Sequence, residues 1–234
     1  MSKRIFIDGS INSELCIIAA DGQEINYFDY SDDLASSKKN NIYLGIVSRV
    51  EPSLQAAFIE FGSEKKAFLP FDEIHPSYFK LPHKEKILEN DNAKTNEIDE
   101  ERNNTKDFLS FYRKYKIQDV IKKDQVLLIQ IVKEERGTKG AAITTFISLP
   151  GRYSVLLPNN SSTGGVSKKI SNPLDRKRLK KLHDNFNLPE GMSLIIRTNA
   201  ISAEDEDIIA DFSYLRKLWT KVREDTLKSK APVL

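Results

Sequence analysis

Cysteine is nearly absent from this 234-residue sequence, which contains only Cys16. A single thiol cannot form an intramolecular disulfide and cannot supply a cysteine cluster for a zinc ion. No apolar run approaches the roughly 20 residues that a membrane-spanning helix needs. The opening residues MSKRIFIDGS also lack the apolar core and cleavage site of a secretory signal. We therefore expect a cytoplasmic protein without a transmembrane segment.

Histidine is scarce as well, and His75, His83 and His183 show no metal-ligand spacing. The sequence has no recognisable Ser-His-Asp grouping and no glycine-rich phosphate loop. The acidic run 204–207 is explained as the first turn of a helix, where carboxylates complement the positive end of the helix dipole. These absences predict no catalytic residue and no metal site in this chain.

Positive charge is concentrated in one part of the sequence. The net charge is only +2, so the overall balance says little about a polyanionic partner. Between residues 161 and 183, however, one acid stands among seven basic residues: Lys168, Lys169, Arg176, Lys177, Arg178, Lys180 and Lys181. This basic patch is a candidate phosphate-binding surface, and a solvated helix face is the alternative interpretation.

The first 149 residues read mainly as strands. RIFI, ELCIIAA and EINYFDY form a small β-rich opening with a hairpin turn at Asp21-Gly22, and the polar stretch 31–41 is a linker. Five more strands are predicted in NIYLGIVSRV, QAAFIEF, KKAFLP, QVLLIQIV and AAITTFISL (141–149). A charged insertion, 82–118, separates the third from the fourth and is expected to be exposed and partly disordered. Five strands with this excursion favour an OB-fold barrel, which binds oligonucleotides.

After residue 150 strands and helices alternate. RYSVLLP and MSLIIRT are predicted strands, each followed by a helix, over about 172–186 and 202–228. Asn172 followed by Pro173 is a typical helix start, and Ser202 with Asp205 predicts a capping box. The whole chain is therefore expected to be α+β.

One aromatic residue stands out within the predicted barrel. In QAAFIEF, period-two geometry puts Ala57, Ile59 and Phe61 on one face and Phe58 on the other, beside Glu60. An aromatic ring on a polar face is suited to stacking on a base. Phe68 on the next strand would flank it, and Lys133, Arg136 and Lys139 would contact phosphates. The alternative is that Phe58 packs under the following loop.

Long segments of the sequence resemble the ribonuclease E/G family. NIYLGIVSRVEPSLQAAFIEFGSEKKAFLP resembles its S1-type RNA-binding OB-fold, and KEERGTKGAAITTFISLPGRY resembles the continuation. PNNSSTGGVSKKI, LPEGMSLIIRTNA and APVL are also similar, so the resemblance covers nearly all of the chain except 82–118. It implies a five-stranded S1-type OB-fold barrel inserted in a partial RNase H-like and 5′-sensor α+β region. The implied domains are 1–40 (RNase H-like opening strands), 41–149 (OB-fold) and 150–234 (5′ sensor).

The resemblance also assigns roles to particular residues. Phe58, Phe68 and Lys139 match positions that hold single-stranded RNA, while Arg197, Thr198 and Val155 match a pocket for an RNA 5′ monophosphate. An adjacent guanidinium and hydroxyl suit such a phosphate on chemical grounds alone. Among the basic residues, Lys168 and Lys169 stand where the family often has arginines, which keeps the charge and loses the bidentate geometry.

The function implied by the resemblance is single-stranded RNA binding and 5′-end recognition within an endoribonuclease of RNA processing and decay. The carboxylates that hold Mg in the full-length family enzyme, and its Zn ligands, are expected outside this chain. Asp8, at the end of RIFI, resembles the first carboxylate of active RNase H folds but has no evident partner acids.

The expected partners are RNA with a 5′ monophosphate, the catalytic portion and other decay enzymes. A peripheral position at the inner membrane face is left open. So are two alternatives: a nuclease active only together with a carboxylate domain, and an independent RNA-binding regulator.

Overall fold

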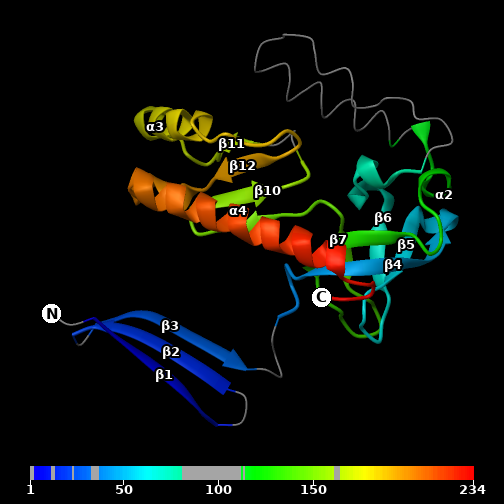
Figure 1. The fold of residues 1–234 in the computed structure, drawn as a ribbon, viewed down its shortest axis with the longest axis horizontal. Coiled ribbons are helices and arrows are strands. Elements are labelled where there is room, and N and C mark those ends of the chain that lie inside the picture. Colours follow the sequence, from blue (N-terminus) through cyan, green and yellow to red (C-terminus); the bar gives the residue numbers. More distant parts are fainter. Residues whose placement is uncertain are drawn as a thin grey trace. The chain divides into compact units, whose positions relative to one another are not determined.

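The computed structural model describes residues 3–11, 14–22, 24–32, 37–80, 112, 114–160 and 164–234. The chain forms two compact units, Met1–Lys38 and Lys39–Leu234 (Figure 1). Most of the predicted insertion 82–118 lies outside the described residues. In the part of the chain that is described, no helix is long and apolar enough to cross a membrane.

The first unit is a three-stranded antiparallel sheet. Its strands are β1 (Lys3–Ile11), β2 (Glu14–Asp21) and β3 (Glu24–Asp32), in the order β1-β2-β3. Gly22 follows β2 with a φ of +65°, a left-handed conformation that glycine adopts without steric cost, and Asp21 pairs with Glu24 across the turn. This confirms the predicted hairpin.

The second unit begins with a closed barrel of five strands. They are β4 (Ile42–Glu51), β5 (Ala56–Glu60), β6 (Ala67–Pro70), β7 (Val126–Lys133) and β8 (Ala142–Thr144), joined in the order β4-β5-β6-β8-β7. The β6–β8 contact is parallel and the other pairings are antiparallel. Together with the helices of the chain, this barrel confirms the predicted α+β OB-fold.

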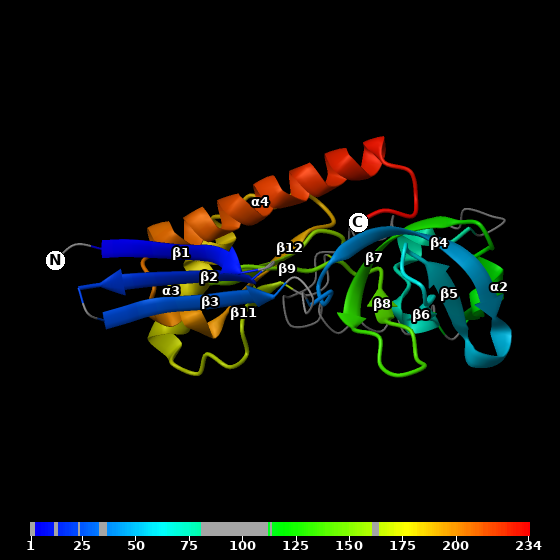
Figure 2. The same ribbon diagram turned by 90° about the horizontal axis from the view of Figure 1, so that it is seen from below.

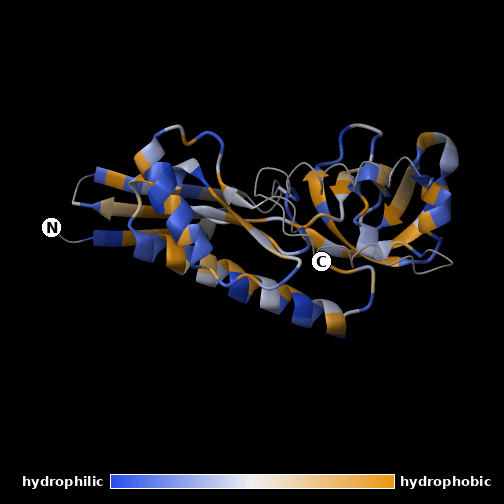
Figure 3. Cartoon of the chain, turned by 90° about the horizontal axis from the view of Figure 1, so that it is seen from above, coloured by the Kyte–Doolittle hydropathy of each residue, from blue (hydrophilic) through white to orange (hydrophobic). Residues whose placement is uncertain are grey.

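Alternating burial along the strands builds the barrel core. Ala57, Ile59 and Phe61 are buried as predicted. Gly45 on β4 is needed for close packing, because an added Cβ would come within 2.6 Å of the Ile59 side chain. Figure 3 shows hydrophobic residues along the barrel strands, and others on the strands and helices of the rest of the chain.

Short helical segments connect the barrel strands. The 3-10 turn η2 (Pro52–Leu54) joins β4 to β5, while η3 (Phe71–Glu73) and η4 (Pro76–Tyr78) follow β6. Helix α2 (Ile117–Val120) precedes β7 and buries Ile117 and Val120.

The remaining residues form a four-stranded sheet with two helices. Its strands are β9 (Leu149–Pro150), β10 (Ser154–Leu157), β11 (Gly165–Val166) and β12 (Ser193–Ile196), in the order β11-β12-β10-β9. The single strand predicted over 141–149 was wrong, because its two ends form β8 in the barrel and β9 in this sheet. The bend between them occurs where Phe146 N donates to Thr144 Oγ1 and Ile147 N donates to Asn159 Oδ1.

Helix α3 (Pro173–Asp184) begins as predicted, with Asn172 Oδ1 accepting from Leu174 N and Pro173 in the first turn. Helix α4 (Asp205–Lys228) starts later than predicted. The capping box with Ser202 was wrong, since residues Thr198–Ser202 form the 3-10 helix η5 and Glu204 is the N-cap without a side-chain cap bond. Asp205 instead binds Arg178 on α3.

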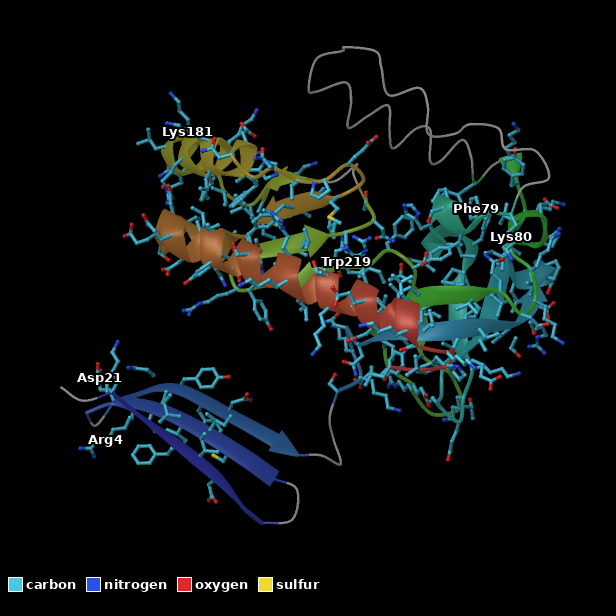
Figure 4. The ribbon with its side chains drawn as sticks, viewed as in Figure 1. Arg4, Asp21, Phe79, Lys80, Lys181 and Trp219 are labelled. Carbon is cyan, nitrogen blue, oxygen red and sulfur yellow. The ribbon has the colours of Figure 1, made fainter. Side chains whose placement is uncertain are left out.

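Both helices pack on one face of the sheet. Leu179 of α3 clusters with Ile196, and Phe212 of α4 clusters with Leu156 and Leu194. Trp219, midway along α4, adds to the second cluster (Figure 4). Helix α4 continues toward the barrel (Figure 2), where the last residues return along β4 and Val233 pairs with Leu44.

Candidate nucleic-acid interface

Phe58 and Phe68 form a cross-strand pair on the outside of the barrel. They are register partners on β5 and β6, and their ring centroids lie 5.9 Å apart at 69°. Both side chains are half-buried, whereas Ile59 beside them is completely buried. A base therefore has ring surface to stack on without displacing the barrel core.

Arg49 belongs to the same surface, although the sequence reasoning missed it. It is the β4 partner of Phe58, and its guanidinium carbon lies 4.7 Å from the centre of the Phe58 ring. Strict alternation from the buried Val47 would turn Arg49 into the core. A bulge at Ser48 shifts the register and turns Arg49 outward. The exposed Arg49 side chain therefore adds a cation, stacked on Phe58, to the surface formed by Phe58 and Phe68.

Lys139 lies at the tip of the β7–β8 loop. The backbone N–H and C=O groups of Arg136 and Lys139 bond to each other, which closes the loop and leaves the Lys139 side chain exposed. The loop is held against β6 and the residues just before it, because Lys65 Nζ donates to Gly137 O and Phe68 N donates to Ala141 O. Lys139 thus lies on a loop that hydrogen bonds hold beside β6, the strand that carries Phe68.

The second group of predicted residues meets at one edge of the four-stranded sheet. Arg197 and Thr198 follow β12, Lys168 and Lys169 follow the parallel strand β11, and the antiparallel β10 begins at the same edge. Ser167 N donates to Ile196 O, which fixes the β11 end beside Arg197. The sheet therefore gathers residues that are separated by about 30 positions in the sequence.

Val155 and Arg197 take different positions at this edge. Val155 lies within β10, half-buried, and pairs with Ile195. Arg197 is exposed, and its Nη1 donates to Gly151 O over 2.6 Å. An adjacent open hollow of about 300 Å³ is lined by Arg152, Tyr153, Asn199, Ser202 and Ala203.

Asp211 on α4 holds this edge together. Its Oδ1 accepts from Arg152 N (2.9 Å), and its Oδ2 accepts from Tyr153 N (3.2 Å), Ser154 N (2.9 Å) and Ser154 Oγ (2.7 Å). Gly151 allows this approach, since an added Cβ would lie 2.5 Å from the carboxylate. Asp211 thereby fixes the turn whose Gly151 carbonyl holds Arg197. No local pattern indicated it, because it lies 57 to 59 residues from its partners.

The predicted basic patch divides into two kinds of residue. Arg178 Nη1 binds Asp205 and Ala203 O, and its Nη2 binds Ala200 O and Ile201 O, so its donors serve the packing of α3 against η5. Arg176 similarly donates to Ser167 O. Lys177 and Lys181 are exposed on α3 (Figure 4 labels Lys181), as is Lys180.

The described residues contain no group of three or more His, Cys, Asp or Glu that could hold a metal ion. Asp8 is exposed on β1 opposite Cys16. The Mg and Zn expected for a full-length enzyme of the family that the sequence resembles stay a prediction.

Comparison with known proteins places these residues in a family context. Residues 148–234 match the model described as "Ribonuclease E/G family". Over 232 residues the chain is 37% identical to ribonuclease E of Escherichia coli (strain K12) and 38% identical to ribonuclease E of Buchnera aphidicola subsp. Schizaphis graminum (strain Sg). Over 184 residues it is 38% identical to ribonuclease G of Salmonella typhimurium (strain SL1344).

The matches cover much of this chain and little of each relative. They span 99% of the chain for the two ribonuclease E sequences and 79% for ribonuclease G. The same matches cover 19% and 21% of the two ribonuclease E sequences and 32% of ribonuclease G.

Proposed function

Because this chain belongs to the ribonuclease E/G family, we propose that it binds single-stranded RNA as the amino-terminal part of an endoribonuclease of RNA processing and decay. The alternative of an independent RNA-binding regulator is not favoured, since the relatives are named as ribonucleases. Both parts of the proposal, at the barrel and at the sheet edge, concern the binding of RNA.

The observation that carries this proposal is the aromatic pair on the barrel. Phe58 and Phe68 present ring surface on the outside of an OB-fold, with Arg49 against Phe58 and Lys139 on the adjoining loop. Aromatic stacking contributes about 1 to 3 kcal/mol per base, and cations beside it bind the phosphates. Such a surface suits a flexible single strand, whose bases can turn onto the rings.

The finer part of the proposal is that the sheet edge recognises a 5′ monophosphate. Arg197 and Thr198 would contact the phosphate, with Val155 beside them and Lys168 and Lys169 adding charge. One side of the Arg197 guanidinium is fixed, because its Nη1 donates to Gly151 O. The other N–H donors of the group are then left for an anion. Its orientation is thus set before a ligand arrives.

One experiment tests both parts. Affinities are measured for a single oligoribonucleotide carrying either a 5′ monophosphate or a 5′ hydroxyl, with the wild type, Phe58→Ala and Arg197→Lys. Phe58→Ala should weaken both RNAs equally, by about 1 to 3 kcal/mol. Arg197→Lys should weaken only the monophosphorylated RNA, by about 1.5 to 3 kcal/mol, because an ammonium cannot reproduce the planar fork.

Each half of the proposal has its own failure. If a folded Phe58→Ala variant keeps full affinity, the aromatic pair is not the RNA platform. If the wild type binds the two 5′ ends equally, the sheet edge is not a phosphate sensor in this chain.

A further inference from the structure

A cationic groove lies on the barrel next to the aromatic pair and shares Arg49 with it. It has a volume of about 680 Å³ and includes Arg49, Lys66, Lys122 and Lys123, with Ser48 and Ile121 between them. Among the described residues, all of the charged ones that line this groove are cations.

Two parts of the fold are clamped together to make the groove. Asp124 N donates to Val47 O and Val47 N donates to Gln125 O, both over 2.8 Å. These bonds hold the turn before β7 against β4, so Lys122 and Lys123 stand beside Ser48 and Arg49. The buried Ile121 anchors the same turn in the barrel core.

The remaining two cations come from the strands. Lys66, just before β6, donates from Nζ to Ser48 Oγ over 2.5 Å, so it is held over the β4 bulge. Arg49 is exposed, at 64% of its side-chain surface, and lies against the Phe58 ring. Arg49 is therefore shared between the groove and the aromatic pair.

This arrangement favours an extended anion over a single phosphate. Like charges gathered on one surface repel each other, and bound phosphates relieve that repulsion while releasing their own counterions. The groove is open, and four cations line it. A ligand that continues from the Phe58 ring into the groove must carry a flat base followed by phosphates.

We propose that the cationic groove binds the sugar-phosphate backbone of the same RNA strand whose base stacks on Phe58. The RNA contact surface of the barrel then extends past Arg49 to Lys122 and Lys123. This inference rests on the proposed RNA-binding function, and it adds a binding surface that the aromatic pair alone does not supply.

The test compares oligoadenylates of about 4 and about 12 nucleotides, two lengths within the roughly 4 to 16 nucleotides that one OB-fold covers. The complete chain is titrated as wild type, Lys122→Ala/Lys123→Ala, Phe58→Ala and the control Lys221→Ala/Lys228→Ala. The control removes the same charge from exposed positions of α4. Thermal unfolding checks that each variant is folded.

The groove variant should bind the 12-mer about tenfold more weakly, and its slope of log K against log salt should be shallower by about 1.4, or about 0.7 for each lost phosphate contact. Its affinity for the 4-mer should fall by a smaller factor than its affinity for the 12-mer, because a tetranucleotide bound at Phe58 has fewer phosphates to place in the groove. The control variant should behave as the wild type with both RNAs.

The two proposals fail in different ways. If the groove variant and the control bind the 12-mer equally while Phe58→Ala weakens the 4-mer, the groove proposal is wrong and RNA binding at the aromatic pair stands. If the wild type binds neither RNA, or Phe58→Ala has no effect on the 4-mer, the underlying RNA-binding proposal is wrong.

Discussion

The barrel face and the sheet edge present their functional side chains by different physical means. On the barrel, strand register places Arg49, Phe58 and Phe68 in one row, and each ring is supported by the core beneath it. At the sheet edge, four hydrogen bonds to Asp211 fix the turn that positions Arg197. We therefore expect single substitutions on the barrel face to leave its structure in place. The structure of the sheet edge should instead depend on the Asp211 carboxylate.

The largest expected effect tests that dependence directly. Asp211→Ala should lower the free energy of unfolding by about 3 kcal/mol, because three backbone N–H groups and the buried Ser154 hydroxyl lose their acceptor. Urea denaturation measures this, with Glu224→Ala on the exposed side of the same helix as the control. Equal stabilities of the two variants would remove the distinction between the regions.

The next effect separates the two kinds of residue within the basic patch. Arg178→Ala should cost about 2 kcal/mol of stability, since it leaves the carbonyls of η5 and the Asp205 carboxylate without their donor. The neighbouring exposed Lys177→Ala should change stability by less than about 0.5 kcal/mol. Similar losses in both would mean that α3 carries one uniform charged face.

A smaller effect links the turn that Asp211 holds to the recognition of the RNA 5′ end. Asp211→Asn retains the shape of the side chain but loses one acceptor oxygen, so the turn and Gly151 O should be held less firmly. The preference for a 5′ monophosphate over a 5′ hydroxyl should fall by about 1 kcal/mol, with unchanged affinity for the hydroxyl end. Phe58→Ala is the matched opposite, because it should lower affinity and leave the preference intact. A preference that survives in Asp211→Asn would contradict the positioning role.

The smallest effect concerns pH and the barrel. Burial lowers the pKa of His75 below its ordinary value of 6.5. The folded state therefore resists protonation of this residue more than the unfolded state does. The barrel should have its full stability above pH 6.5 and lose a little as the pH falls from there toward the lowered pKa. Urea denaturation at two pH values should show this loss in the wild type, and it should shrink in His75→Gln.

Much of the secondary structure and half of the proposed site followed from local sequence patterns. Alternation in QAAFIEF turned Phe58 away from the core, and Asp21-Gly22 and Asn172-Pro173 gave a hairpin and a helix start that the structure confirms. Arg49 was missed because a bulge reverses the alternation that such reasoning assumes. Ser202 was wrongly taken as a cap, because the 3-10 helix that precedes α4 uses those residues.

What the sequence determined by itself depends on neighbours in the chain: strand periodicity, turn residues, helix caps and the choice of aromatic and basic side chains. The tertiary structure decided which cations remain available and what holds them. Arg178 is committed to η5, Asp211 fixes a turn 57 residues earlier, and Lys122 lies beside Arg49 in the cationic groove. The physical reason is that hydrogen bonds and charge interactions act over distances in space, which the order of residues does not reveal until the chain has folded.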